Sequence, residues 1–243
     1  MMKPQIIEIH KTQLADYYNI HTREIIIVCG CGSSLNEFKN PDDFITIGVN
    51  DVGRMFTPTY LVVVNYRQQF KNGRFKYVQE SRAQAIFTQL DLKLDHPNVV
   101  HFKLGRRGGT DFSNPNMLHY TQNSPYVALC LAVHMGAKRI GLIGIDFTDH
   151  HFFANTGPHN LTGSLQQINQ EYTALNKVLL RRSIEVVNFS QQSLLTAFPK
   201  VDFNLFLNKY SHIKLNGIKI SNQKLGKGAV AVTNIKFKQR GNK

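Results

Sequence analysis

Two glycines and two serines follow a short aliphatic run, at a place where a nucleotide phosphate could bind. Residues 25–28 are all β-branched, which predicts a strand buried on both faces of a parallel sheet. Gly30 and Gly32 and then Ser33 and Ser34 come next; glycine permits close backbone approach, and a serine-capped helix start binds anions. The pattern predicts a phosphate-cradling turn. An ordinary strand–turn–helix corner is the alternative, because the third glycine of the dinucleotide fingerprint and the Gly-Lys-Ser/Thr of a P-loop are absent.

Asparagines end the next two aliphatic runs. Asn50 follows residues 44–49, and Asn65 follows residues 60–64. Ligands of open α/β sheets bind beyond the carboxyl ends of the strands, and an amide can bind a base or a ribose without adding charge. Asparagine also ends strands through turn chemistry alone, which is the alternative interpretation.

Two more polar residues are predicted at the same edge of the sheet. Asp146 follows the aliphatic residues 139–145, and Ser124 precedes Pro125 at the start of a predicted helix over residues 124–135. We expect Ser124 to help position a nucleotide and Asp146 to order the site from its strand end.

The segment after Asp146 is rich in histidine, a side chain that can accept a proton from a hydroxyl near neutral pH. It contains His150, His151 and His159, whose spacing matches no helical pair of metal ligands, and the chain has no Asp-x-Asp. We therefore favour acid–base use of one histidine over metal ligation. His150 and His151 read as ordinary surface-loop residues.

Strands alternate with helices along the chain, which predicts an α/β, Rossmann-like, mostly parallel sheet with helices on both faces. Residues 105–109, Gly-Arg-Arg-Gly-Gly, are predicted to form a flexible basic loop, and residues 110–123 carry few structural signals. The remaining predicted elements are a short helix at residues 12–18, strands at 85–88, 99–102 and 184–188, a helix at 165–180 and a helical turn at 193–198.

The net charge of +13 is concentrated at the end of the chain. Residues 209–243 hold nine Lys or Arg and no Asp or Glu. We expect an N-terminal extension (1–23), a nucleotide-sugar-binding catalytic domain (24–208) and a basic C-terminal tail or marginal hairpin (209–243). Such a tail suits an acidic partner, which could be anionic lipid, nucleic acid or an acidic glycan; a merely solubilising tail is the alternative.

The cysteines and the hydropathy pattern point to the cytoplasm. Cys29, Cys31 and Cys130 read as free core thiols in a reducing compartment. No apolar run reaches membrane-spanning length, and the first residues lack the apolar stretch of a signal peptide. We expect a cytoplasmic protein, peripheral to the inner face of the membrane if its tail binds lipid.

Several segments together resemble the bacterial lipooligosaccharide sialyltransferases, in the same order and at similar spacing. They are VCGCGSSL (28–35), Asn50 and Asn65, the segment from Ser124 to Phe147 that ends in Gly-Ile-Asp-Phe, GPHN (157–160) and SQQSLLTAF (190–198). The resemblance implies transfer of a sugar from a CMP-activated donor to a glycan or lipid-linked acceptor, in lipooligosaccharide biosynthesis, with neither metal nor cofactor. It also implies that the glycine turn, Asn50, Asn65 and Ser124 hold the nucleotide and that His159 is the general base.

The chain departs from that family at three positions. Ser33 replaces a proline, Thr121 replaces an arginine, and Thr148 replaces a tyrosine that assists the leaving phosphate. The resemblance therefore favours the nucleotide more strongly than sialic acid as the sugar.

Two other functions stay open. The first motif and the Gly-Ile-Asp segment also resemble the archaeal 6-hydroxymethylpterin diphosphokinase-like proteins, which implies pyrophosphoryl transfer with Mg²⁺ on carboxylates such as Asp51, Asp146 and Asp149. The third interpretation is a non-catalytic binder of nucleotides or nucleic acid that uses the basic tail. A homo-oligomer is compatible with all three.

Overall fold

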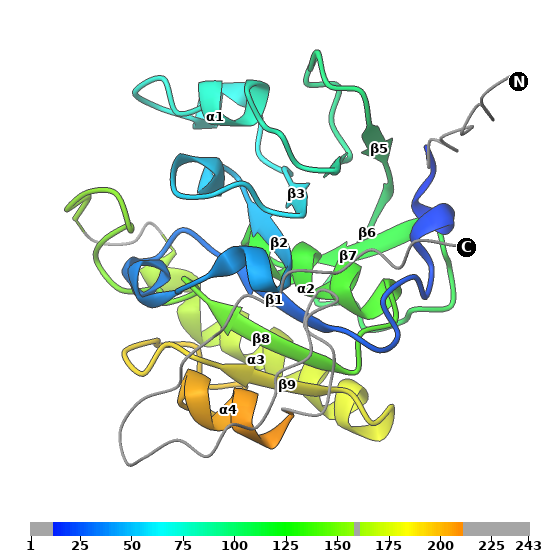
Figure 1. Ribbon diagram of the computed structural model, residues 1–243, viewed down its shortest axis with the longest axis vertical. Coiled ribbons are helices and arrows are strands. Elements are labelled where there is room, and N and C mark those ends of the chain that lie inside the picture. The colour runs from blue at the N-terminus through cyan, green and yellow to red at the C-terminus, as the bar shows by residue number, and fades with distance from the viewer. Residues whose placement is uncertain (1–11, 158–160, 211–243) are drawn as a thin grey trace, which may run out of the picture.

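A seven-stranded sheet organises the computed structural model, which describes residues 12–157 and 161–210 (Figure 1). All neighbouring strands are parallel, in the order β5-β4-β3-β2-β1-β8-β9. The predicted α/β fold is thus confirmed. The strands are β1 (Ile25–Cys29), β2 (Ile45–Val49), β3 (Tyr60–Val62), β4 (Ala85–Thr88), β5 (Val99–His101), β8 (Arg139–Ile143) and β9 (Glu185–Asn188).

Strand order reverses beside β1, because β2 lies on one side of it and β8 on the other. Parallel α/β sheets bind ligands at such a switch point, outside the carboxyl ends of the strands. The glycine turn follows β1, and Asp146 lies just beyond β8. Both are therefore at the expected place.

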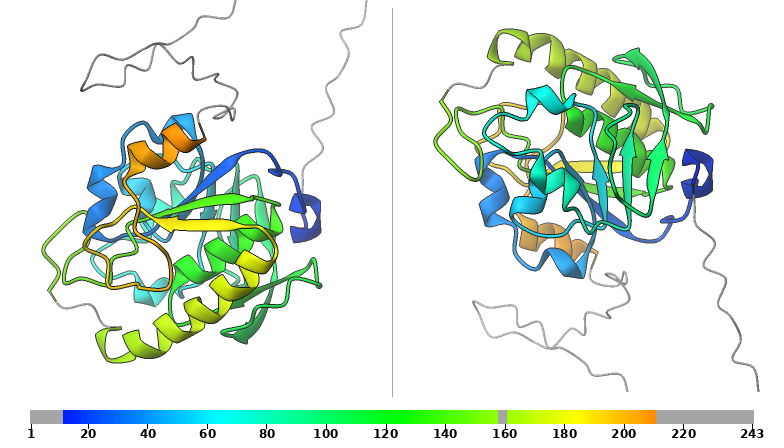
Figure 2. Two further views of the ribbon diagram at one scale, coloured as in Figure 1. Left: turned by 90° about the horizontal axis from the view of Figure 1, so that it is seen from below. Right: turned by 90° about the horizontal axis from the view of Figure 1, so that it is seen from above.

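Helices cover both faces of the sheet, as predicted. The α-helices α2 (Ser124–His134) and α3 (Leu165–Arg181) lie on one side, and α4 (Phe203–Lys209) lies on the other (Figure 2). The second face is also covered by α1 (Lys76–Gln79) and the 3₁₀ helices η2 (Ser33–Glu37) and η4 (Val52–Arg54). Other 3₁₀ helices are η1 (Leu14–Tyr17), η3 (Pro41–Asp43), η5 (Arg67–Gln69) and η6 (Thr162–Ser164).

The side chains of β1 alternate between the two faces of the sheet and pack into a hydrophobic core on each face. Ile26 and Val28 pack toward α2 and α3, whereas Ile25 and Ile27 pack toward the second face. All four are at most 2% exposed, and full burial of such a side chain contributes about 1.5–3 kcal/mol. The unbroken aliphatic run is therefore explained by burial on both faces.

The side chain of Asn123 caps the N-terminus of helix α2. Ser124 has a residue type that is also typical of an N-cap, but it does not cap the helix. The Asn123 Oδ1 accepts a hydrogen bond from the Tyr126 N–H at 3.0 Å, and Ser124 is the first helical residue. This shift by one residue releases the Ser124 hydroxyl from capping, so that it can contact other side chains.

The predicted loop at residues 105–109 is wrong in its first half. Residues 103–107 form β6 (Lys103–Arg107), which pairs in parallel with β7 (Met117–Tyr120) as a separate two-stranded sheet. The His119 ring packs where side chains of Gly105 and Gly109 would lie: a Cβ on these residues would come within 2.4 and 2.2 Å of its Nδ1. The glycines therefore admit a histidine ring and do not mark a flexible loop.

The helical turn predicted at residues 193–198 is not formed. The Ser193 hydroxyl donates to the Ile145 carbonyl at 2.7 Å and accepts from the Leu195 N–H at 3.1 Å. These side-chain contacts hold the segment against the end of β8 without a helix.

The described part of the N-terminal extension packs on the domain. Leu14 and Tyr17 of η1 are buried, and the Leu14 carbonyl lies 2.8 Å from His134 Nε2 at the end of α2. No helix within residues 12–157 and 161–210 is long and apolar enough to cross a lipid bilayer. The predicted hairpin after Tyr210 lies outside the described residues.

Candidate active site

The glycine turn after β1 interlocks with the turn after β8. Gly30 N–H donates to the Ile143 carbonyl at 2.8 Å, and Gly32 N–H donates to the Gly144 carbonyl at 2.7 Å. A Cβ on Gly30 would lie 2.2 Å from the Gly144 oxygen, and one on Gly32 would lie 2.5 Å from an Asp146 carboxylate oxygen. Close packing of two turns is therefore sufficient to require glycine at both positions.

Asp146 occupies the helix start that was predicted to bind a phosphate. Its carboxylate accepts from the Ser34 N–H at 2.8 Å and the Ser34 hydroxyl at 2.6 Å, and it is 1% exposed. The Ser34 hydroxyl in turn accepts from the Gly144 N–H at 2.9 Å. The side chain of Ser33 is half-buried and contacts both Asp146, at 3.4 Å, and Gln192, at 2.9 Å. Asp146 thus orders the turn from the end of β8.

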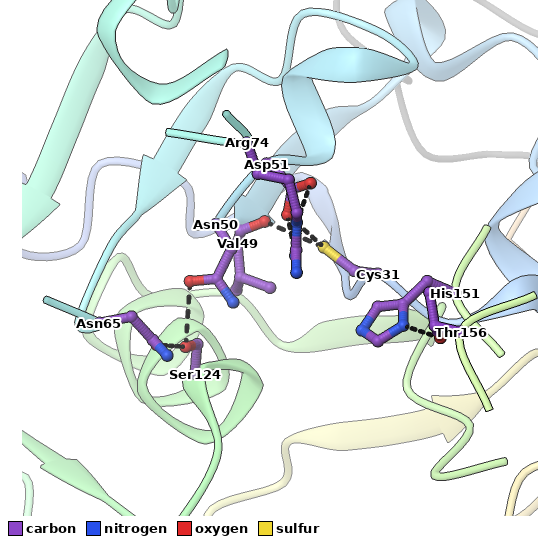
Figure 3. Close-up of polar contacts among 9 residues, drawn as sticks. All are labelled: Cys31, Val49, Asn50, Asp51, Asn65, Arg74, Ser124, His151 and Thr156. Carbon is purple, nitrogen blue, oxygen red and sulfur yellow. Dashed lines mark hydrogen bonds and ion pairs between the residues drawn. The ribbon is translucent and has the colours of Figure 1, made fainter. Parts of the chain in front are cut away.

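Asn50, Asn65 and Ser124 converge, although they are far apart in the sequence (Figure 3). The Ser124 hydroxyl lies 2.8 Å from Asn65 Oδ1 and 3.3 Å from Asn50 Oδ1, and it can donate its proton to either oxygen. Ser124 is 5% exposed, and both asparagines are half-buried. The amide nitrogens of both asparagines have no hydrogen-bond partner among the described residues. Two neutral donors thus remain available beyond the ends of β2 and β3.

A buried ion pair, which no sequence pattern indicates, lies directly beside this cluster. Arg74 donates to both oxygens of Asp51, at 2.8 and 2.5 Å, and Asp51 is 0% exposed. The Cys31 thiol contacts Asp51 Oδ1 at 3.8 Å and the Val49 carbonyl at 3.5 Å. Burial, and secondarily the Asp51 charge, raise the pKa of Cys31 well above its usual value, so this thiol stays protonated.

The histidine-rich segment runs along the glycine turn. His151 forms a β-bridge with Gly32, and the Phe152 N–H donates to the Cys31 carbonyl at 3.0 Å. His151 Nδ1 lies 2.6 Å from the Thr156 hydroxyl, and its ring lies at the edge of the cluster in Figure 3. His151 thus lies nearer the candidate site than the surface-loop interpretation implied. His150 is exposed, and His159 lies outside the described residues.

Phe153 connects the histidine-rich segment to two arginines that follow β2 and β3. The guanidinium carbon of Arg54 lies 4.0 Å from the centroid of the Phe153 ring, and that of Arg74 lies 5.0 Å from it. Cation–π contacts of this kind contribute about 0.5–1 kcal/mol each at exposed sites. They hold residues 149–156 against the segments that follow β2 and β3.

The carboxylates that a magnesium site would need are bound to other side chains or exposed. Asp51 is paired with Arg74, Asp146 is bonded to Ser34, and Asp149 is exposed. Within the described ranges, no group of three His, Cys, Asp or Glu side chains could hold a metal ion.

Thr121, where the sialyltransferases have an arginine, contacts a glutamate. Its hydroxyl donates to Glu171 of α3, and the Arg107 Nε donates to the same carboxylate at 2.7 Å. A cation is therefore present near this position, but β6 supplies it and Glu171 compensates its charge.

The sequence matches no protein-family model and no curated protein. The fold is similar to that of the Maf glycosyltransferase from Magnetospirillum magneticum AMB-1, with a TM-score of 0.54 at 11% identity. That alignment covers 78% of this chain but 37% of the glycosyltransferase, so this chain spans little more than a third of that protein.

Smaller solved structures align over most of their length. The sialyltransferase CstII from Campylobacter jejuni with cytidine-5'-monophosphate gives a TM-score of 0.47 at 17% identity, covering 75% of this chain and 86% of that one. The sialyltransferase CST-II with a trisaccharide acceptor and CMP gives 0.46 at 18%, covering 75% and 87%. The structural neighbours named here are glycosyltransferases, and the TM-score of 0.54 to the Maf glycosyltransferase shows a shared fold.

Proposed function

We propose that this protein is a glycosyltransferase that takes a sugar from a CMP-activated donor and attaches it to a hydroxyl of a glycan or lipid-linked acceptor. The convergence of Asn50, Asn65 and Ser124 carries the proposal. The sequence resemblance to sialyltransferases independently assigns these three residues to the nucleotide. A shared ligand is a reason for three distant polar side chains to meet at the carboxyl edge of a parallel sheet.

The cluster has the chemistry to bind a nucleoside. The Ser124 hydroxyl has one proton, which it donates to Asn65 Oδ1 at 2.8 Å, the nearer of the two amide oxygens. The amide nitrogens of the two asparagines are then directed to other acceptors, such as ribose hydroxyls or a pyrimidine carbonyl. Asn50 adopts a left-handed backbone conformation with φ of 54°, a conformation that asparagine tolerates better than most residues. The backbone thus directs this amide to a defined place.

A Mg²⁺-dependent pterin diphosphokinase is the weaker proposal. Pyrophosphoryl transfer needs carboxylates that converge on a metal bound to phosphates. The oxygens of Asp51 and Asp146 are already used by Arg74 and Ser34. The EDTA sensitivity of turnover separates the two activities, because the proposed transfer needs no divalent ion.

Calorimetry and thermal shift with CMP, CDP and ATP test the proposal. We expect the cytidine nucleotides to bind and to raise the melting temperature; a ligand at 100 times its Kd stabilises a protein by about 2.7 kcal/mol. Asn50→Ala and Asn65→Ala should each weaken CMP binding about 2- to 12-fold, through loss of about 0.5–1.5 kcal/mol for a neutral hydrogen bond. Asn204→Ala, which removes an exposed amide from α4 on the opposite face of the sheet, is the control. Binding of ATP without binding of CMP would contradict the donor assignment.

The acceptor side of the reaction is assigned from sequence resemblance. His159 is proposed as the general base that takes the proton of the acceptor hydroxyl while the bond from the sugar to the phosphate breaks. Residues 209–243 are proposed to bind an anionic membrane surface, which would bring the enzyme to lipid-linked acceptors.

A further inference from the structure

One segment contains all of the excess positive charge of the chain before the C-terminal tail. The chain has +13 in total and the tail contributes nine, so residues 1–208 carry +4. Residues 52–79, hereafter the basic segment, contain five Lys or Arg and no Asp or Glu. The rest of the 1–208 stretch therefore carries −1. The five cations are Arg54, Arg67, Lys71, Arg74 and Lys76.

The basic segment surrounds the nucleotide-binding candidates. It begins at η4, two residues after Asn50, and it contains Asn65 at the end of β3. Helix α1 packs against η4: the Arg54 guanidinium lies 5.2 Å from the centroid of the Tyr77 ring. Figure 1 shows α1 beyond the end of β3, where the chain leaves the sheet. The cations of the basic segment are thus carried by the parts of the chain that leave the ends of β2 and β3.

Four of these five cations have no carboxylate partner among the described residues. Arg74 is paired with Asp51, whereas Arg54, Arg67, Lys71 and Lys76 are exposed and take part in none of the described ion pairs. Elsewhere in the described residues, Lys93, Arg107 and Lys209 each have a carboxylate within 4 Å, whereas other exposed cations, such as Lys103 and Arg106, take part in none of the described ion pairs. The field of the basic segment is thus directed outward, beside the site.

An aromatic ring is exposed in the same place. Tyr66 follows Asn65 directly and is 62% exposed, and Arg67 comes next. A tyrosine ring offers a sugar an apolar face with a hydroxyl at its edge. The combination of an exposed ring with uncompensated cations suits a polar carbohydrate that carries negative charge.

We infer that the acceptor is an acidic glycan, one with a phosphate or carboxylate group near the hydroxyl that receives the sugar, and that the basic segment binds this group. The inference rests on the proposed glycosyltransferase function and specifies its acceptor. The donor nucleotide is assigned to Asn50, Asn65 and Ser124, so cations beyond these residues face the second substrate. Arg67 and Lys71 are the test residues, because neither contacts Asp51 or Phe153.

Kinetics with matched acceptors test the inference. The acceptors are methyl β-galactoside, its 6-phosphate and methyl β-galacturonide, with CMP-N-acetylneuraminic acid as donor. We expect lower KM for both acidic acceptors than for the neutral one. Arg67→Gln/Lys71→Gln should raise KM for the acidic acceptors about 3- to 10-fold and leave kcat and the neutral acceptor unchanged. About 1 M salt should remove the difference, because the screening length falls to about 3 Å.

A second double variant controls for charge alone. Lys103→Gln/Arg106→Gln removes two exposed cations from β6, outside the basic segment, and should leave all three KM values unchanged. Equal KM for neutral and acidic acceptors, or equal effects of the two double variants, would overturn the inference. A preference for the phosphate over the carboxylate, or the reverse, identifies the group.

Calorimetry of the three sugars with CMP-saturated protein tests the acceptor inference by binding alone, so that it needs no enzymatic turnover. Acidic sugars should bind more tightly than the neutral one, and the Arg67/Lys71 variant should lose that difference. If cytidine nucleotides fail to bind, the proposed function fails; the same titrations without CMP then still decide whether the basic segment selects acidic sugars. If CMP binds and all three sugars bind equally, only the acceptor inference fails.

Discussion

Replacement of Arg74 by methionine should strongly destabilise the protein. Asp51 is 0% exposed, and Arg74 supplies both of its charged hydrogen bonds, at 2.8 and 2.5 Å. Removal of one partner of a buried pair leaves an uncompensated charge and typically costs 3–5 kcal/mol. This is a large part of the 5–15 kcal/mol that stabilises a typical protein, and it should lower the urea midpoint by about 1 M or more. Urea unfolding followed by circular dichroism measures the loss.

Two further variants separate charge burial from lost packing. Asp51→Asn/Arg74→Met removes both charges and should be more stable than Arg74→Met alone, because the amide needs no counter-charge. Arg67→Met replaces an exposed arginine of the same segment and should change the unfolding free energy by about 0.5 kcal/mol or less. If Arg74→Met loses no more than Arg67→Met, the Asp51–Arg74 pair does not stabilise the fold.

Two histidines give the remaining predictions. His159→Ala should lower transfer about 10²- to 10⁴-fold in kinetic assays with little change in CMP affinity by calorimetry, since a general base contacts the acceptor; loss of CMP binding first would remove it from this role. Burial, partly opposed by a hydrogen bond to the Leu14 carbonyl, lowers the pKa of His134 below 6.5. The unfolded chain therefore binds the extra proton first as pH falls, so the unfolding free energy should decrease below about pH 6.5, by at most about 1.4 kcal/mol per pH unit. In urea titrations His134→Gln should reduce this slope, and an unchanged slope would show that His134 is not the group responsible.

Local pattern was sufficient to predict the main sheet. The β1 strand is an uninterrupted β-branched run because both of its faces are buried, and the strands near it show similar runs. The pair β6 and β7 was missed because its pattern is different: β6 is half exposed and includes Gly105, whose missing side chain makes room for the His119 ring. A glycine used for packing is indistinguishable, in sequence alone, from a glycine used for flexibility.

The candidate site was predictable only where a residue directly follows a predicted strand or begins a predicted helix, as Ser124 does. Asn50 and Asn65 were found because each is the first polar residue after an aliphatic run. Arg74 was not found, because nothing near it in the sequence indicates that it folds back 23 positions onto Asp51. Nor could sequence spacing show that His151 would bridge to Gly32, a contact made across two separate turns.

The contacts at the sheet edge divide the predicted nucleotide-binding residues into two groups. Gly30, Gly32 and Ser34 direct their hydrogen bonds inward, to the turn after β8 and to Asp146, and Ser34 is 1% exposed. The amide nitrogens of Asn50 and Asn65 have no such partners among the described residues. A ligand that bound through Ser34 would have to displace a buried carboxylate, at a cost of several kcal/mol, whereas one that bound the asparagines would displace only water. The glycine turn is therefore better understood as the support that fixes the strand ends, and the ends of β2 and β3 as the place where the proposed nucleotide would bind.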